Sequence, residues 1–376
     1  MTEHGRVSRV SVSAYSVPTT TAGEAQPESD GTAKWDSTGV LIVEVEADGR
    51  TGLGYSYTSP AALAIIRGVL APHIIGTDPL AAESTFWAMA GAVRNLGWAG
   101  VCASAISAVD IALHDLRARK LEVSLLQLLG GSVTNVMAYG SGGFTSYSIP
   151  ELHNQLGSWA DDGLRAVKMK IGSAPVDDLE RVRAARDAIG PKVQLFVDAN
   201  GAYNVKQALG FAAHFEDEDV TWFEEPVSSD DLAGLRLIRN RGPAGMQIAA
   251  GEYGYTPQYF ATMLGAGAVD TLQADATRCG GVTGFLRAST LAQAAGIPLS
   301  AHTAPAIHAT LGAALANVVH VEYFHDHAQI EAAFFDGGPT LSGGDLQVFR
   351  ASAGHGLTFK RADAERYLVE EWSPVE

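Results

Sequence analysis

The larger part of the chain alternates short apolar runs with segments of helical periodicity. Eight such runs follow residue 130, and a helix-like segment separates each from the next. They are Val136–Tyr139, Ala166–Ile171, Gln194–Asp198, Thr221–Glu225, Gln247–Glu252, Thr271–Asp275, Ile297–His302 and Val318–Glu322. This alternation is typical of parallel strands joined by helices, and eight units match a (β/α)8 TIM barrel. A doubly wound open sheet is the alternative, but it needs no eighth strand, and the early glycine-rich dinucleotide motif is missing.

The first part of the chain has a different order, with strands before helices. Val7–Val17 alternates loosely, Val40–Ala47 is rich in β-branched residues, and Asp48-Gly49 is a hairpin signal before Thr51–Tyr57. A stripe of apolar residues at helical spacing follows over residues 106–116. This pattern predicts an α+β domain ahead of the barrel, so the fold class is α/β with a second, smaller domain.

The two patterns divide the chain into three parts. We expect an α+β domain over residues 1–128, a barrel over residues 129–345 and a C-terminal tail over residues 346–376. The segment Pro18–Trp35 is polar, rich in Thr, Gly, Glu and Pro, and without periodicity, which predicts a loop. A long polar loop inside a compact domain is commonly functional.

The composition limits the classes of partner. The 376 residues include 42 acidic and 26 basic side chains, a formal net charge of −16. This acidity argues against binding to nucleic acid or to an anionic membrane, because both need clustered Lys and Arg. Cys102 and Cys279 form neither a zinc motif nor a disulfide framework, and neither a signal-peptide pattern nor a bilayer-spanning run is seen. We therefore expect a cytoplasmic protein.

Ionisable residues stand at the ends of the predicted strands, from the second strand to the eighth. They are Lys168, Lys170, Asp198, Glu224, Glu252, Asp275, His302 and Glu322. In a (β/α)8 barrel, catalytic groups come from the carboxyl ends of the strands. This register predicts that these residues share one site at the mouth of the barrel.

Three of these residues are carboxylates on neighbouring strands. Asp198, Glu224 and Glu252 would repel one another unless a cation lay between them. An all-oxygen set suits Mg²⁺, which keeps positions open for substrate oxygens, whereas zinc prefers imidazole or thiolate ligands. Strand-end caps or solvated loop charges are the alternative, but the shared register favours a metal site.

A pair of lysines ends the second strand. Lys168 and Lys170 are two residues apart, so both side chains point to one face of the strand, here the barrel interior. Neighbouring ammonium groups disfavour each other's charge, so we expect a lowered pKa that suits a general base. A solvent-facing pair is the alternative, but Val167, Met169 and Ile171 supply an equally apolar opposite face.

A histidine on the far side of the predicted site has a carboxylate beside it. Asp275 and His302 end adjacent strands. A carboxylate beside a histidine fixes its tautomer and raises its basicity. The two residues therefore predict a second acid/base group.

Two further groupings give weaker indications. His325-Asp326-His327 resembles a chelating sequence, but it lies in a predicted loop after the last strand, so we assign it no metal. Asp110 and His114 have helical i,i+4 spacing and are expected to form a surface pair.

Taken as an ordered set, these residues resemble the enolase superfamily and, within it, the mandelate racemase subgroup. The motifs are Lys168-x-Lys170, Asp198-x-Asn200, Glu224-Glu225-Pro226, Gly251-Glu252, Asp275 before Gly280-Gly281, His302 and Glu322, with Ala112–Leu116 and Leu128–Gly131 in the first domain. The resemblance implies an α+β capping domain, a modified (β/α)8 barrel and a tail that returns to the cap. Asp275 stands where the muconate-lactonising and dipeptide-epimerase branch has lysine.

The resemblance also implies roles for single residues. The implied Mg²⁺ ligands are Asp198, Glu224 and Glu252, one ion per subunit. The implied catalytic residues are Lys170 as one base with Lys168 beside it, and His302, backed by Asp275, as the acid/base group on the opposite face. Glu322, when protonated, would donate a hydrogen bond to a substrate carboxylate, and Asn200 would lie near metal and substrate. The loop that ends in Lys34 and Trp35 would close over the site and select the substrate.

The implied chemistry is abstraction of the proton α to a carboxylate, with Mg²⁺ stabilising the enediolate. We favour loss of a β-hydroxyl from an acid sugar, an aldonate or aldarate, which gives a 2-keto-3-deoxy acid. A racemase, epimerase or cycloisomerase acting on a 2-hydroxy acid or a sugar-acid lactone is the main alternative, because it would use the same residues. A non-catalytic acid-sugar-binding barrel is a third. The family further implies a homo-oligomer, a dimer or octamer.

Overall fold

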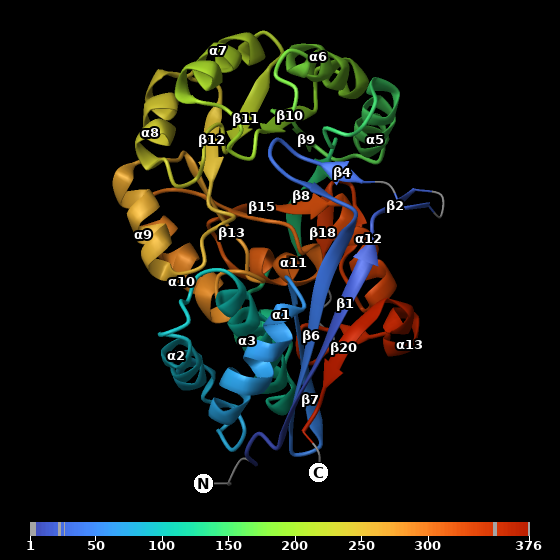
Figure 1. The fold of residues 1–376 in the computed structure, drawn as a ribbon, viewed down its shortest axis with the longest axis vertical. Coiled ribbons are helices and arrows are strands. Elements are labelled where there is room, and N and C mark those ends of the chain that lie inside the picture. The colour runs from blue at the N-terminus through green and yellow to red at the C-terminus, as the bar shows by residue number, and fades with distance from the viewer. Residues whose placement is uncertain (1–4, 22–23, 26, 349–351, 375–376) are drawn as a thin grey trace.

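The structure is a computed structural model that describes residues 5–21, 24–25, 27–348 and 352–374. Its larger body is a closed barrel of eight parallel strands (Figure 1). The strands are β8 (Asn135–Gly142), β9 (Ala166–Lys170), β10 (Gln194–Asp198), β11 (Val220–Glu224), β12 (Gln247–Ala250), β13 (Thr271–Ala274), β14 (Leu299–Ala301) and β15 (Val318–Phe324). Each pairs with its sequence neighbours, and β15 pairs with β8 to close the ring. The predicted barrel fold is confirmed.

Helices follow the barrel strands and cover the outside of the ring (Figure 1). They are α5 (Ile149–Asp161), α6 (Asp178–Ile189), α7 (Val205–Glu216), α8 (Leu232–Arg241), α9 (Pro257–Ala266), α10 (Gly281–Ala294), α11 (Pro305–Ala314) and α12 (His325–Phe334). Local sequence signals mark several starts. Ser148 with Glu151, and Asn204 with Gln207, form capping boxes that satisfy backbone N–H groups at the first turns of α5 and α7.

The smaller body is an antiparallel sheet with helices on one side. The sheet has the order β20 (Leu368–Trp372), β1 (Arg9–Pro18), β6 (Ser37–Ala47) and β7 (Arg50–Tyr57). Its helical elements are α1 (Ala61–Ile65), the π-helical turn η1 (Ile66–Leu70), η2 (Ala71–His73), α2 (Ala82–Ala92), α3 (Val101–Lys120) and α4 (Leu125–Leu128). Asp48 and Gly49 both have positive φ, at 52° and 69°, which makes the predicted tight turn between β6 and β7.

The C-terminal segment crosses from one body to the other. Near the barrel it forms β16 (Phe335–Asp336), β17 (Thr340–Ser342), β18 (Asp345–Gln347) and β19 (Thr358–Phe359), followed by α13 (Arg361–Ala364) and η3 (Glu365–Tyr367). β20 then pairs antiparallel with β1, so the first and last strands lie side by side (Figure 1). The last strand of the chain therefore belongs to the sheet of the smaller body.

The segment Pro18–Trp35, predicted to be an irregular loop, contains two short antiparallel ribbons. β2 (Thr20–Thr21) pairs with β3 (Glu24–Ala25), and β4 (Glu28–Ser29) pairs with β5 (Lys34–Trp35). Residues 22–23 and 26 of the segment lie outside the described residues. The second ribbon is tied to the barrel, since the Ser29 and Thr145 hydroxyls are hydrogen bonded at 2.7 Å.

The predicted surface pair Asp110 and His114 is wrong, because both side chains are buried between the two bodies. The Asp110 carboxylate accepts hydrogen bonds from the Thr283 N–H at 2.9 Å and from the Thr283 hydroxyl at 2.6 Å. The His114 Nε2 lies 2.9 Å from that same hydroxyl. Helical spacing shows that two residues share a face, but it does not show what covers that face.

A second polar contact joins the two bodies beside the barrel mouth. The Tyr55 hydroxyl donates to Glu331 Oε1 at 2.7 Å and accepts from the Ile307 N–H at 3.1 Å. Glu331 Oε2 accepts from the Ala306 N–H at 2.7 Å, so it satisfies a free donor at the start of α11. Together these contacts fix the smaller body over the carboxyl ends of the barrel strands. Within the described residues, no helix is long and apolar enough to cross a membrane.

Close packing of β7 on α3 generates a stability prediction. A Cβ at Gly54 would overlap the backbone of Ala108 and Ala112 on α3, so Gly54→Ala is expected to destabilise the fold by about 1–3 kcal/mol. The control is Gly210→Ala, in the middle of α7, where nothing lies within 4 Å. This change is expected to raise stability by about 0.5–1 kcal/mol. Thermal unfolding midpoints of both variants test the packing, and an unchanged midpoint for Gly54→Ala would contradict it.

Candidate active site

The carboxyl ends of the barrel strands face the smaller body across a cavity of about 450 Å³. The barrel side contributes Lys170, Glu252, Arg278, His302 and Glu322 to its lining. The opposite wall comes from the segment before β6 and from the end of β7. Four of the ionisable strand-end residues therefore line this one cavity: Lys170, Glu252, His302 and Glu322.

The three carboxylates predicted to bind metal lie together. Asp198 ends β10, Glu224 ends β11, and Glu252 follows β12 by two residues. Each offers a carboxylate oxygen, and these oxygens all lie within 4.8 Å of one another. All three side chains are buried. The donor set is all oxygen and anionic, which is the set a hard divalent cation such as Mg²⁺ requires.

The two lysines contact these carboxylates directly. Lys168 Nζ lies 2.7 Å from both oxygens of Glu224 and 2.8 Å from Glu322 Oε1, and Lys170 Nζ donates to Asp198 Oδ2. Burial disfavours both charges, but the carboxylates outweigh it and raise the pKa of Lys168 and of Lys170. The expected lowering is therefore wrong for the protein without metal. The neighbouring carboxylates act more strongly than the lysines act on each other.

His302 and Asp275 form the expected pair. His302 Nδ1 lies 3.0 Å from Asp275 Oδ2, and the Asp275 Oδ1 atom accepts from the Thr277 N–H and hydroxyl, both at 2.7 Å. The other ring nitrogen, Nε2, faces the cavity side, 3.2 Å from Glu252 Oε2. Although burial opposes it, the surrounding carboxylates raise the pKa of His302 to about 9. Asp275 thus fixes the ring so that Nε2 is the atom available for proton transfer.

Glu322 is buried beside Lys168 and His302. Burial would raise its pKa, but Lys168 and then His302 lower the pKa of Glu322 to about 2. Its Oε2 accepts from the Thr303 N–H at 3.0 Å. Glu322 therefore accepts a hydrogen bond here, and its role as a protonated donor to a substrate carboxylate stays a prediction.

Strained backbone follows three of these strand ends. Asn200, Glu225 and Thr303 have positive φ values of 46°, 37° and 51°. Such a conformation is unfavourable for residues with a side chain and persists where surrounding contacts hold it. One such contact is the Asn200 N–H, which donates to Asp198 Oδ1 at 2.9 Å. These turns follow directly after the strand-end side chains that lie at the mouth of the barrel.

The residues predicted to bind substrate divide into two groups. Asn200 and Trp35 line the cavity. Lys34 is exposed and is not among the lining residues, because neighbouring residues on a strand point to opposite faces and Trp35 takes the inner one. The structure therefore does not bring Lys34 to the site.

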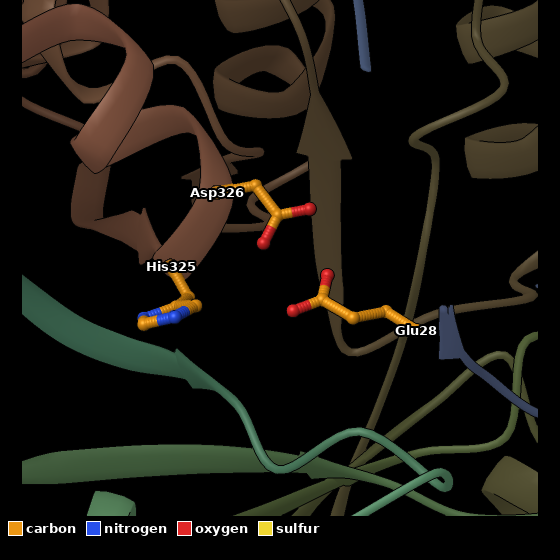
Figure 2. Close-up of side chains that lie close together, drawn as sticks. All are labelled: Glu28, His325 and Asp326. Atoms are coloured by element: carbon orange, nitrogen blue, oxygen red, sulfur yellow. The ribbon is translucent and has the colours of Figure 1, made fainter. Parts of the chain in front are cut away.

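Two features of the site were missed from the sequence. Arg278 lines the cavity and lies 3.3 Å from Glu252 Oε1 and 3.6 Å from Asp275 Oδ2. Its position three residues after Asp275 could have indicated from the sequence that Arg278 lies near the site. The second feature is a pair of buried carboxylates, Glu28 and Asp326, which point at each other with His325 beside them (Figure 2). Glu28 comes from a segment that shows no periodicity, so no sequence pattern links it to Asp326.

Comparison with known families and structures agrees with this geometry. A family model for the mandelate racemase/muconate lactonizing enzyme N-terminal domain matches residues 19–130, and one described as enolase C-terminal domain-like matches residues 151–364. The chain belongs to the mandelate racemase/muconate lactonizing enzyme family of the enolase superfamily. The resemblance inferred from the strand-end motifs is thereby confirmed.

Three members of this family illustrate how similar the chain is to known proteins in sequence and structure. The chain is 34% identical to a 3,6-anhydro-α-L-galactonate cycloisomerase from Streptomyces coelicolor, covering 77% of this chain and 80% of that one. It is 48% identical to a mandelate racemase/muconate lactonizing enzyme-like protein from Rubrobacter xylanophilus, with a TM-score of 0.93 over 97% of this chain and 100% of that one. It is 30% identical to an L-talarate dehydratase from Polaromonas sp. JS666 solved with Mg and L-glucarate, with a TM-score of 0.88 over 98% and 99%.

The carboxylate cluster generates a prediction for metal binding. Mg²⁺ binds the folded state alone, so at a hundred times its Kd it is expected to raise the free energy of unfolding by about 2.7 kcal/mol. The thermal midpoint rises accordingly. Glu252→Gln removes one charged ligand and is expected to abolish this increase. Glu365→Gln, an exposed glutamate on η3, is the control and should respond like the wild type. An unchanged Mg²⁺ response in Glu252→Gln would contradict the assignment.

Proposed function

We propose that this protein is a Mg²⁺-dependent acid-sugar dehydratase, which removes the proton α to a carboxylate and expels the β-hydroxyl. The observation that carries the proposal is the pairing of Lys170 with a carboxylate-backed His302 on the same cavity. Three strand positions separate β9 from β14 round the closed ring, so two proton-transfer groups approach one ligand from different sides. Similarity to a dehydratase over nearly the whole chain supports the same reaction class.

The metal ligands in this proposal are Asp198, Glu224 and Glu252. Their buried oxygens lie within 4.8 Å of one another, and a solved relative is described with Mg. A bound Mg²⁺ would neutralise the charge that develops on a substrate carboxylate when its α-proton leaves. The nearby ammonium group of Lys168, 2.8 Å from Glu322, adds positive charge at the same end of the cavity.

The protein's own residues move the protons. The one of Lys170 Nζ and His302 Nε2 that is deprotonated accepts the α-proton, and the other, still protonated, delivers a proton to the departing β-hydroxyl. A divalent cation held by the three carboxylates would take over the charge compensation that raises the pKa of both groups. The C–O bond breaks, water leaves, and the enol that remains tautomerises to a 2-keto-3-deoxy acid. Asp275 is a positioning residue, because its contact with His302 Nδ1 directs Nε2 toward the cavity. Asn200 and Trp35, on the cavity wall, would contact the substrate.

A cycloisomerase is the second candidate function. The specific observation in its favour is the 34% identity to a 3,6-anhydro-α-L-galactonate cycloisomerase over 77% of this chain. Such a reaction would use the same carboxylates and the same two acid/base residues. Product structure separates the two functions.

We further propose the setting in which the enzyme works. Residues 1–128 and the tail 346–376 would form one cap over a barrel of residues 129–345, a division supported by the pairing of β20 with β1. The enzyme would be a cytoplasmic homo-oligomer, a dimer or octamer, and its two buried, unpaired cysteines are compatible with a reducing compartment. Light scattering coupled to gel filtration measures the oligomeric state.

The function is tested with a panel of acid sugars and acid-sugar lactones in the presence of Mg²⁺. We expect at least one acid sugar to yield a 2-keto-3-deoxy acid, detected as its semicarbazone and identified by NMR in D₂O. Formation of a ring-opened or ring-closed isomer of unchanged mass, identified by NMR, would instead establish the cycloisomerase, and formation of an epimer would establish a racemase or epimerase. A panel in which no member is converted, with Mg²⁺ bound, would contradict both.

A further inference from the structure

The cavity has two chemically different ends. The barrel end is lined by Glu252, Lys170, His302 and Arg278, and the other two proposed metal ligands lie beside Glu252. The cap end is lined by hydroxyl groups, among them those of Ser16, Ser37, Thr38, Thr58 and Ser59. Because a substrate carboxylate must lie at the barrel end, the remainder of the molecule extends toward the cap.

The cap end has no cation to meet a second carboxylate. Among the described cavity-lining residues, the cap contributes no lysine or arginine. Over residues 18–33 the sequence itself has no Lys, Arg or His, and it contains Glu24, Glu28 and Asp30. Asp30 lines the cavity.

The basic residues that do line the cavity are already engaged or neutral. Lys170 donates to Asp198, Arg278 lies 3.3 Å from Glu252 Oε1, and His302 Nδ1 lies 3.0 Å from Asp275 Oδ2. His327 is buried and stacked on Tyr57, with ring centroids 3.3 Å apart, and burial lowers its pKa well below the usual value. It is therefore neutral at physiological pH.

An acidic pair lies behind the cap end of the cavity. Asp326 lines the cavity and accepts from Trp35 Nε1 at 3.2 Å, and Glu28 points at Asp326 from the cap (Figure 2). Burial, followed by repulsion from Asp326, raises the pKa of Glu28 to about 9. Burial also raises the pKa of Asp326. Two carboxyl groups this close favour sharing one proton, which leaves one negative charge on the pair at the cavity wall.

We infer that this site selects acid sugars with a single carboxylate and a neutral polyol tail, aldonates or their anhydro forms, and rejects the corresponding aldarates. The inference rests on the proposed function, since that function places the first carboxylate at the barrel end. Hydroxyl side chains can donate to and accept from the hydroxyls of the tail. A second carboxylate would instead meet Asp30 and Asp326 in a partly enclosed site, where like charges are strongly unfavourable.

The test compares substrates that differ only at the far carbon. For each hexose configuration, kcat/KM is measured with Mg²⁺ for the aldonate, which ends in CH₂OH, and for the aldarate, which ends in a carboxylate. We expect the aldonate to be preferred by at least about 100-fold in the configuration that is converted. Equal turnover, or preference for the aldarate, would overturn the inference.

Variants test whether the acidic pair causes the discrimination. The double change Glu28→Gln/Asp326→Asn removes the charge of the pair, and the ratio of the two kcat/KM values is expected to fall at least tenfold. Asp36→Asn is the matched control, because Asp36 is exposed beside Trp35 and does not line the cavity. It should leave the ratio within about twofold. An unchanged ratio in the folded double variant would contradict a role for the pair.

Measuring the binding of sugar acids tests this inference independently of the proposed reaction. If no sugar acid is converted, the reaction is wrong, and thermal stabilisation of the Mg²⁺-loaded protein by each aldonate and aldarate decides the selectivity. Stabilisation by an aldonate but not by its aldarate would support the inference. Equal stabilisation by both, or stabilisation by neither, would overturn it.

Discussion

Compensation of buried charge at the barrel mouth is the constraint on which the rest of the site depends. Five carboxylates lie at or near the carboxyl ends of the barrel strands: Asp198, Glu224, Glu252, Asp275 and Glu322. Each lies within 4.0 Å of a Lys, Arg or His nitrogen, and each is buried. Removing one partner would leave a buried charge uncompensated, which costs several kcal/mol. The same concentration of carboxylates makes a divalent cation favourable there, so part of the chain's acidity serves the site.

The smaller body covers the barrel mouth and supplies hydroxyl and carboxylate side chains to the cavity wall. Its contacts with the barrel, through Tyr55 with Glu331 and through Asp110 with Thr283, fix it over the mouth. The charged barrel end is the part on which the proposed reaction class rests. The cap end, with its hydroxyl side chains and its acidic pair, is the part from which we infer the selectivity.

Sequence periodicity located the barrel well, because each strand is a short apolar run bounded by a helix of regular length. The strand-end residues could be assigned to one site because parallel strands bring their carboxyl ends to one edge. Contacts between distant segments were not accessible in this way. The lysine pKa values depend on carboxylates from other strands. The Asp110 side chain is covered by α10, which lies far away in the sequence. Glu28 contacts Asp326, although the two residues stand near opposite ends of the chain. Lys34 and Trp35 are neighbours in sequence, but their side chains point in opposite directions, so only Trp35 lines the cavity.

The account's central claim is that Lys170 and His302 are the two groups that move protons at one substrate. The most direct measurement is kcat for Lys170→Ala and for His302→Asn on the substrate that the panel identifies, with Mg²⁺ binding and thermal midpoints confirming that each variant is folded. The account predicts that each variant loses at least about 100-fold in kcat, because general acid–base groups contribute on this scale. Full activity in either folded, Mg²⁺-loaded variant would contradict it.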